Sequence, residues 1–307
     1  VAYQTAYMKA NYPSEYMTAV LSAESGNMDM ISEAIKECQR MGLPVLPPDV
    51  NESFEDFTVV KKSDEADKIR FGLVTIKNLG TEIAKAIVLE REERGHFTSI
   101  ANLLERVQHK NLNKKSLEAL IKSGAMDSLG EERGKLLANL EQLIAYHQST
   151  LKAGDNQDSL FGLLADQSSV PQLKFHEAEP ASAREKLTWE KELLGLYVSG
   201  HPLDAFADKF KNNENTIKKV REALDGQNVV AAGLLEEIRA ITTKKGDQMA
   251  FVKLTDFTGT IECVVFSRIY VEAKELLQPE KCVAVKGRLS MRNGEPSIVV
   301  EQIKELS

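Results

Sequence analysis

Residues 227–307 constrain the fold more than any other part of the chain, because segments rich in β-branched residues alternate there with turn signals. Turns are expected at Lys244-Lys245-Gly246-Asp247, Asp256-Phe257-Thr258-Gly259 and Arg292-Asn293-Gly294. A single helix is expected at Ser267–Leu277. The segments between these breaks are five predicted strands: Val229–Ile241, Met249–Leu254, Ile261–Phe266, Cys282–Leu289 and Ile298–Ile303.

Five strands with a helix between the third and the fourth have the order of an OB-fold, an all-β barrel. Such barrels bind single-stranded nucleic acid on strands two and three and the adjoining loops, with basic groups on phosphates and aromatic rings under bases. The alternative is a purely structural barrel, and Phe257 and Phe266 are alternatively core residues. The candidate contacts for single-stranded DNA are Lys244, Lys245, Phe251, Lys253, Arg268, Arg288 and Arg292.

Residues 61–152 contain a repeated helical unit. Phe71–Lys77 is a short apolar segment, Asn78-Leu79-Gly80 is a tight turn, and Thr81–Arg94 is an amphipathic helix. This pattern indicates a helix-hairpin-helix unit, in which a glycine allows close backbone approach and the free N–H groups of the following helix bind a DNA phosphate. Such hairpins usually have glycine where this chain has Asn78, and asparagine tolerates the left-handed conformation. The predicted duplex contacts are Lys77, Asn78, Leu79, Gly80, Thr81 and Lys85.

A second copy follows the first. Leu112–Ser123 is a predicted helix, Gly124-Ala125-Met126 is the hairpin, and Glu131–Leu151 is the second helix. Two tandem units usually form one all-α domain that holds duplex phosphates without reading sequence. Lys122 and Gly124 are the predicted duplex contacts of this copy, and the alternative is plain helical packing without DNA.

The remaining segments are also mainly helical. Residues 1–48 are expected to be helical up to a stop at Gly42, with Asn27 as the N-cap of one helix. Tyr3, Tyr7, Tyr12 and Tyr16 have the spacing of a packed helical face. A connecting helix is predicted at Arg184–Ser199, ended by Gly200-His201-Pro202. The chain starts in mid-pattern without Met, which suggests a piece of a longer protein.

Between these parts lies the polar segment Gly154–Gly162, which carries an adjacent Leu-Phe pair. Its low apolar content predicts a solvated loop, and an exposed Leu-Phe pair can enter a hydrophobic pocket of another protein. Gln157 would bond at the rim of that pocket. The alternative is a pair that folds back onto its own domain. The predicted binding peptide is Gln157, Asp158, Ser159, Leu160 and Phe161.

Composition excludes several classes of function. The net charge is −7, but residues 215–307 carry 14 basic and 13 acidic groups, so they can present a basic face to phosphate. Cys38, Cys263 and Cys282 are isolated in apolar surroundings, which predicts reduced core residues and no metal site. The sequence has no apolar run long enough for a membrane helix and no phosphate-binding Gly-Lys-Ser/Thr motif.

The order of these parts, together with four sequence strings, resembles the C-terminal half of the bacterial DNA polymerase III alpha subunit, a C-family replicative polymerase. Gln-x-x-Leu-Phe resembles the peptide by which bacterial replication proteins bind the ring-shaped sliding clamp. The strings are Tyr3-Gln4-Thr5-Ala6-Tyr7, Leu46-Pro47-Pro48-Asp49-Val50-Asn51, Leu120-Ile121-Lys122-Ser123-Gly124-Ala125, and Glu192-Leu193-Leu194-Gly195-Leu196-Tyr197-Val198-Ser199-Gly200-His201-Pro202.

The resemblance implies a multidomain α+β protein. It divides the chain into 1–44 (the helical end of the fingers), 45–152 (tandem helix-hairpin-helix), 153–214 (clamp-binding loop and connecting helix) and 215–307 (OB-fold). Its partners would be the beta sliding clamp, double-stranded and single-stranded DNA, and other polymerase III holoenzyme subunits, in the bacterial cytoplasm near the nucleoid.

The resemblance also implies a DNA-directed DNA polymerase whose catalytic carboxylates and Mg²⁺ lie in a palm domain upstream of this chain. Asp64/Asp67 and Asp204/Asp208 lack the rigid strand setting that two Mg²⁺ ions need. The fragment is therefore expected to hold no catalytic residue and no cofactor, and to be inactive alone. The alternative is a non-enzymatic clamp-binding and DNA-binding adaptor in replication or repair.

Overall fold

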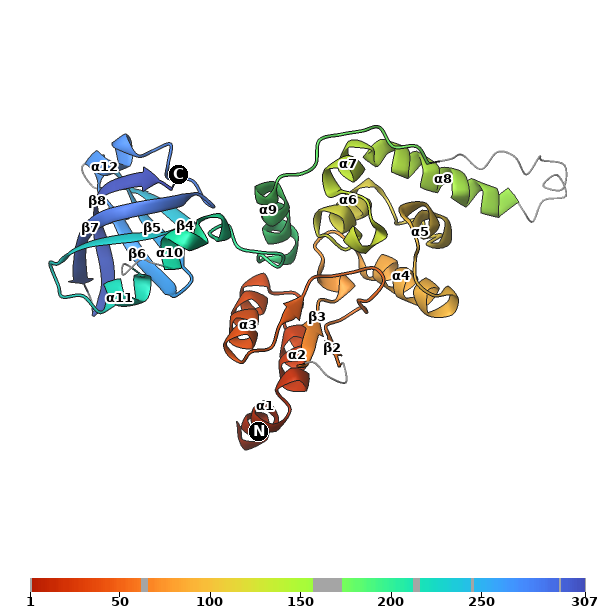
Figure 1. Ribbon diagram of the computed structural model, residues 1–307, viewed down its shortest axis with the longest axis horizontal. Coiled ribbons are helices and arrows are strands. Elements are labelled where there is room, and N and C mark those ends of the chain that lie inside the picture. The colour runs from red at the N-terminus through yellow and green to blue at the C-terminus, as the bar shows by residue number, and fades with distance from the viewer. Residues whose placement is uncertain are drawn as a thin grey trace. The chain divides into compact units, whose positions relative to one another are not determined.

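The computed structural model describes residues 2–61, 66–156, 173–211, 216–243, 246–292 and 294–306. They form two compact units, Val1–Ser199 and Gly200–Ser307, each with its own buried apolar cluster. The first unit is mainly helical and the second is a barrel (Figure 1). The predicted fold class, a helical region followed by a closed five-stranded barrel, is confirmed. The finer division into four domains stays a prediction.

The first unit starts with three helices, α1 (Ala2–Asn11), α2 (Pro13–Ala23) and α3 (Met28–Arg40). Asn27 caps α3 as predicted, because its side chain accepts a hydrogen bond from the backbone N–H of Met30 at 3.3 Å. Gly42 follows with a φ of 73°, the left-handed conformation that ends a helix.

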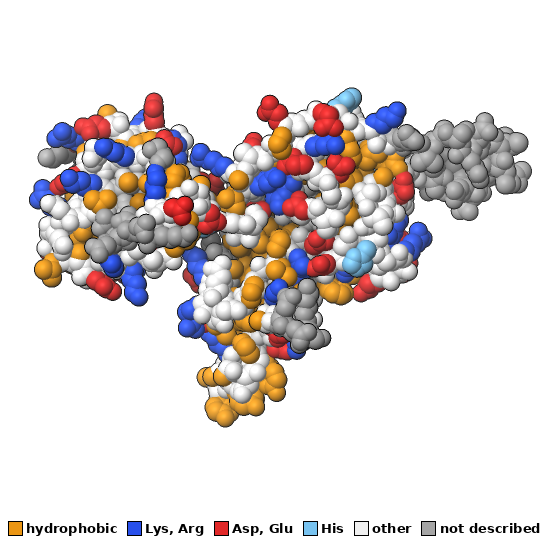
Figure 2. All heavy atoms as spheres, viewed as in Figure 1, with side chains coloured by type: hydrophobic (Ala, Val, Ile, Leu, Met, Phe, Trp, Pro, Cys, Tyr) orange, Lys and Arg blue, Asp and Glu red, His pale blue; other side chains and the backbone are white. Residues whose placement is uncertain are grey.

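Of the four tyrosines predicted to pack, Tyr16 of α2 does so against the core, but the prediction is wrong for Tyr12 and for the tyrosine face of α1. The side chain of Tyr3 is 82% exposed and that of Tyr7 is 50% exposed, and Tyr12 is exposed as well. Figure 2 shows hydrophobic side chains gathered on the surface of this helix. The periodicity identified the helix and its apolar face, but no described segment covers that face.

A small sheet that the sequence analysis missed joins α3 to the hairpin region. Its strands are β1 (Val45–Leu46), β2 (Thr58–Val60) and β3 (Lys68–Arg70), in the order β1-β3-β2. β3 pairs in parallel with β1 and antiparallel with β2. Strands of two or three residues are too short to show an alternating pattern, so tertiary contacts alone reveal them.

The rest of the first unit is helical, and all of these helices contribute to one apolar core that also takes in α2 and α3. Leu79, Leu103 and Leu120 are fully buried in this core. The elements are η1 (Leu73–Thr75), α4 (Thr81–Arg94), α5 (Ile100–Arg106), α6 (Lys114–Lys122), η2 (Asp127–Leu129), α7 (Arg133–Ala138), α8 (Leu140–Asn156) and α9 (Ala183–Leu194).

Asn139 breaks the single helix predicted at Glu131–Leu151 into α7 and α8. Its side chain donates to the backbone oxygen of His176 at 2.9 Å and accepts from the backbone N–H of the same residue at 2.7 Å. The fully buried amide of Asn139 thus holds the segment at His176 against the junction of α7 and α8. Hydrophobic spacing continued across Asn139, so the sequence pattern could not locate the break.

Two other helices are shorter than predicted. α9 ends at Leu194 and not at Ser199, because Gly195 adopts a left-handed φ of 80°. The helix of the barrel, α12, ends at Glu272 and not at Leu277, and the chain then turns so that Leu277 is buried against the barrel. At α12 the burial of Leu277 outweighs continued helix.

The second unit starts with η4 (Asp204–Phe206), α10 (Ala207–Lys211) and α11 (Ile217–Arg221). Its barrel strands lie in the closed order β4-β5-β6-β8-β7, and α12 (Ser267–Glu272) joins β6 to β7. All five predicted strands are present. Their bounds are β4 (Asn228–Thr242), β5 (Gln248–Asp256), β6 (Gly259–Val265), β7 (Cys282–Arg292) and β8 (Glu295–Glu305).

Two glycines allow the barrel to close. A Cβ atom on Gly287 would lie 2.2 Å from the backbone oxygen of Val299, and one on Gly233 would lie 2.5 Å from the backbone oxygen of Thr255. Gly287 adjoins a register shift between β7 and β8. Close backbone approach at such bends is a usual role of glycine within strands.

We expect Gly287→Ala to lower the free energy of unfolding of the barrel by about 1–3 kcal/mol, because the added methyl group would push β8 away. The matched control is Gly259→Ala, whose Cβ would meet nothing closer than Ile217 at 3.9 Å. Urea denaturation of the full chain, followed by amide hydrogen exchange in β7 and β8, measures both effects. Equal stability of the two variants would contradict the close-approach explanation.

Candidate nucleic-acid interface

The first predicted hairpin projects from the surface of the helical unit at Lys77–Thr81. Leu79 is fully buried and anchors the turn, while its neighbours on both sides are exposed. Asn78 has a φ of 74° and Gly80 a φ of 41°. The left-handed conformation expected for Asn78 is therefore confirmed.

This hairpin leaves the start of α4 open to solvent. Gly80 is the N-cap and supplies no side-chain hydrogen bond to the helix. The first N–H groups of a helix have no intrahelical partner, and they favour anions. A phosphate can therefore approach the backbone at Gly80 and Thr81 without displacing a protein group that caps the helix.

Two lysines stand beside the open helix start. The backbone N–H of Lys77 donates to the oxygen of Leu193 in α9 at 3.0 Å, which fixes the root of the hairpin. Within the described ranges the ammonium group of Lys77 has no ion-pair partner. Lys85 lies 4.0 Å from Glu82, and both side chains are largely exposed, so this ion pair is weak. Both cations are available to a phosphate.

The second hairpin has a different setting. Gly124 has a φ of 80°, and a Cβ there would lie 2.2 Å from Nη2 of Arg133. The Lys122 ammonium pairs with Glu118 at 2.6 Å and lies 5.8 Å from the centre of the Trp189 ring. Packing therefore accounts for both residues, and their predicted contact with DNA stays a prediction.

Arg133 is the centre of this packing. Its guanidinium donates to Asp127, to the backbone oxygen of Lys122 and to Glu190, which is itself 1% exposed. Burial alone would lower the pKa of Arg133, but the hydrogen bonds and charges of Asp127 and Glu190 raise it. The second hairpin and α9 are thus joined through one buried cation.

The loop between β1 and β2 connects the two hairpin units. The backbone N–H of Val50 donates to the oxygen of Ala125 in the second hairpin at 2.8 Å. The Asn51 side chain makes two hydrogen bonds with the backbone of Phe97, just after α4, at 2.9 and 2.7 Å. The buried guanidinium of Arg91 donates to the oxygens of Val50 and Ser53.

The predicted clamp-binding residues Gln157, Asp158, Ser159, Leu160 and Phe161 lie outside the described residues, as do Lys244 and Lys245. The side chain of Arg292 is also not described. For these residues the sequence analysis stands as a prediction.

The structure brings Phe251 and Lys253 together on the outer face of β5. Phe251 is half-buried and faces Arg239 of β4 and Val264 of β6 across the ladder. Lys253 faces Glu237 and Glu262 in the same way and pairs with Glu236 at 3.8 Å. A groove of about 400 Å³ runs along this face. The positive charges of the basic side chains that line this groove are balanced by carboxylates.

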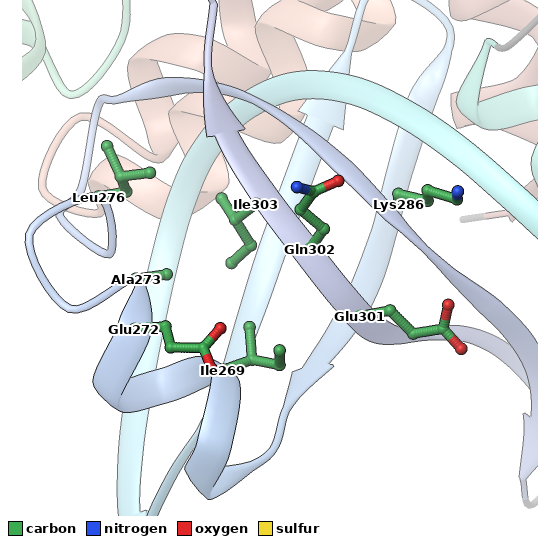
Figure 3. A pocket seen from close by; sticks show the side chains of 8 residues that line it. All are labelled: Ile269, Glu272, Ala273, Leu276, Lys286, Glu301, Gln302 and Ile303. Carbon is green, nitrogen blue, oxygen red and sulfur yellow. The ribbon is translucent and has the colours of Figure 1, made fainter.

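Arg268 and Arg288 lie apart from that face, beside a second pocket of about 470 Å³ between α12 and β8 (Figure 3). Arg268 pairs with Glu272 at 3.3 Å and Arg288 with Glu301 at 2.8 Å, and these two carboxylates line the pocket. In the register of β4, Arg288 faces Asn228, whereas Phe251 faces Arg239. The described candidates for single-strand contact therefore do not form one continuous patch.

The sequence analysis left Phe257 and Phe266 as alternative core residues, and the structure exposes half of each ring. Phe257 lies in the turn between β5 and β6, next to the basic helix α11, where Lys218, Lys219 and Arg221 are exposed. In the sequence, this basic surface could have been found from the basic residues at 218–221, which precede the first barrel strand.

No helix of the described residues is long and apolar enough to cross a membrane. Within the same residues, no three His, Cys, Asp or Glu side chains gather in a way that could hold a metal ion.

Family models match both units. A model described as "Helix-hairpin-helix motif" covers residues 42–136, and one described as "OB-fold nucleic acid binding domain" covers residues 229–306. The exposed hairpin and the closed barrel agree with these descriptions. The chain thus combines a helix-hairpin-helix module with an OB-fold module.

Curated relatives identify the family. The chain is 41% identical to DNA polymerase III subunit alpha of Thermus aquaticus over 88% of this chain and 22% of that protein. For the Borreliella burgdorferi subunit the identity is 39%, over 99% and 26%, and for that of Aquifex aeolicus it is 38%, over 94% and 23%. The chain therefore belongs to the DNA polymerase III alpha-subunit family, and it spans about a quarter of the length of these relatives.

We expect Asn78→Val to lower the free energy of unfolding of the helical unit by about 1–2 kcal/mol, because a β-branched residue resists the left-handed conformation. Asn78→Gly is the matched control and should leave stability unchanged or raise it slightly. Thermal unfolding followed by the fluorescence of Trp189, the only tryptophan, measures both. Two variants with the same midpoint would show that the conformation at position 78 does not limit the turn.

Proposed function

We propose that this chain holds and guides DNA for a replicative DNA polymerase. The hairpin at Lys77–Thr81 binds phosphates of the duplex, and the barrel binds the single-stranded template. The observation that carries the proposal is the exposed, uncapped start of α4 beside two available lysines, in a chain of the polymerase III alpha family. Contacts of this kind give affinity without sequence preference, as replication requires.

Catalysis is assigned to the parent enzyme and not to this chain. The relatives are DNA polymerase subunits, and template-directed nucleotidyl transfer needs carboxylates that hold Mg²⁺ on a rigid element. Asp204 instead lies in a short 3-10 turn and accepts a hydrogen bond from the backbone of His201 at 2.5 Å. Asp67 accepts a hydrogen bond from Ser14 at 2.6 Å. We infer that the chain is inactive alone.

The peptide Gln157–Phe161 is proposed to bind a ring-shaped sliding clamp. It follows α8, which reaches Asn156, and the buried Leu143 and Tyr146 fix that helix in the core. A tether of this kind turns the rebinding of template into an intramolecular event at high effective concentration. Gln157 would bond at the rim of the pocket, and Leu160 and Phe161 would enter it.

Replacing Lys77 and Lys85 together by Gln should weaken duplex binding and reduce the salt dependence of the affinity. The expected decrease is about 2 in the slope of log K against log salt concentration, close to one for each lost phosphate contact. Fluorescence anisotropy with a duplex at several salt concentrations measures it.

The matched control for this pair is Lys110→Gln with Lys115→Gln, two exposed lysines of the same unit outside both hairpin turns. An equal loss of slope in this control would mean that charge alone, and not the hairpin, drives the binding.

Leu160→Ala with Phe161→Ala should weaken the binding of a purified bacterial sliding clamp by at least about 30-fold, since each anchor of this kind commonly contributes more than 1 kcal/mol. Isothermal titration calorimetry measures the affinity. The control is Leu163→Ala with Leu164→Ala, which removes similar apolar bulk outside the five-residue peptide. Unchanged binding by the first variant would refute the clamp proposal.

A further inference from the structure

The barrel unit carries an aromatic and basic surface away from the strand face predicted from the sequence. We call it the turn surface, and it consists of Phe257 in the β5–β6 turn and of Lys218, Lys219 and Arg221 on α11. α11 packs against β6 and β4 at this end of the barrel (Figure 1).

The buried carboxylate of Asp256 builds the turn surface. Its Oδ2 accepts from the backbone N–H of Ile217 at 2.8 Å, at the start of α11. Its Oδ1 accepts from the backbone N–H of Thr258 at 2.7 Å and of Gly259 at 3.0 Å. The Thr258 hydroxyl oxygen in turn accepts from the backbone N–H of Lys218 at 3.1 Å. One carboxylate thus fixes the helix and the aromatic turn to each other.

Phe257 packs against two other rings and is still half exposed. Its ring lies 5.5 Å from the ring of His201 at an interplanar angle of 52°, and 5.5 Å from that of Phe210 at 88°. The remaining 51% of the residue is open to solvent. A large aromatic group that is supported by two other rings and exposed on its outer side has the form of a stacking platform for a base.

The cations of the turn surface are available. Lys218 and Arg221 are three residues apart and share one face of α11. The guanidinium of Arg221 donates to the backbone oxygen of Thr260 at 3.4 Å, which directs it toward the turn. None of the three basic side chains has an ion-pair partner among the residues that the structure describes, and the carboxylate of Glu222 directly follows Arg221 in the chain.

The predicted strand face differs in its charges. There Lys253 is paired with Glu236 and stands between Glu237 and Glu262 on the neighbouring strands. A phosphodiester approaching that face meets three carboxylates against two cations, Lys253 and Arg239, whereas on the turn surface it meets cations without an ion-pair partner among the described residues, beside an exposed ring. Unpaired cations favour phosphate because their charge is not already neutralised.

We propose that the turn surface binds a single-stranded polynucleotide, with one base stacked on Phe257 and the flanking phosphates on Lys218, Lys219 and Arg221. This inference rests on the proposed function, in which the barrel binds single strands, and it assigns the contact to one adjoining loop, the β5–β6 turn, together with α11, which lies outside the five strands. The bound polynucleotide then runs along the β5–β6 turn and α11.

The test uses the full chain and a fluorescein-labelled oligo(dT) of about 16 nucleotides, the upper end of the site size of one OB-fold. Phe257→Leu keeps the apolar bulk and removes the ring, so affinity should fall at least about fivefold, the lower end for the loss of one stacked base. Phe257→Trp should retain the affinity. The matched control is Phe266→Leu, an equally exposed ring of the same barrel.

The charge test is Lys218→Gln with Arg221→Gln. The salt slope of oligo(dT) binding should fall by about 1.4, because each single-strand phosphate contact contributes about 0.7. Lys274→Gln with Lys304→Gln removes the same charge from exposed positions of the same unit and should leave the slope unchanged.

Three outcomes would overturn the inference. If the turn-surface variants bind as the unchanged chain does while Lys244→Gln with Lys245→Gln loses affinity, the strand lies on the predicted face, and the proposed function survives alone. If Phe257→Leu weakens the binding of poly-glutamate but not that of oligo(dT), the surface recognises an acidic protein segment. If the unchanged chain does not bind oligo(dT), single-strand binding itself is wrong.

Discussion

The loop at Asp49–Ser53 is the contact on which the helical unit depends. It bonds to the second hairpin through Val50 and to the segment after α4 through Asn51. The guanidinium of Arg91 donates hydrogen bonds to backbone oxygens of the loop. Burial lowers the pKa of Arg91, against the opposing charges of Glu92 and Asp49. A buried cation whose donors meet backbone oxygens is costly to release, so the two hairpin units keep one geometry.

The turns of the two hairpins are fixed by different contacts. The first keeps its helix start uncapped and its lysines at the surface, and its turn is fixed by a buried leucine and by the backbone of α9. The second turns around Arg133, whose charge is met by Asp127 and by the buried Glu190. Removing either partner of such a pair would leave an uncompensated buried charge, so the packing of this hairpin depends on these ion pairs. The two copies therefore differ in how their turns are held.

In the barrel, too, ion pairs neutralise cations that the sequence analysis proposed as DNA contacts. On the strand face that the OB-fold analogy points to, Lys253 is paired with Glu236, and Arg268 and Arg288, which lie apart from that face, are each paired with a glutamate as well. Composition counts charges along the chain, but only the register of β4, β5 and β6 shows which of them cancel. On α11, Lys218, Lys219 and Arg221 have no ion-pair partner among the described residues, and they lie next to an aromatic ring whose exposure the sequence left open.

The sequence by itself determined the five barrel strands, the cap at Asn27, the left-handed turn at Asn78 and the family, because each follows from local periodicity, from the backbone preference of one residue or from a sequence string. The tertiary structure decided the break at Asn139, the small sheet β1-β3-β2 and the grouping of the charged side chains. The physical reason is that these depend on partners far away in the chain. Asn139 meets His176, and Lys253 meets Glu236 and Glu262, across distances that no local pattern records.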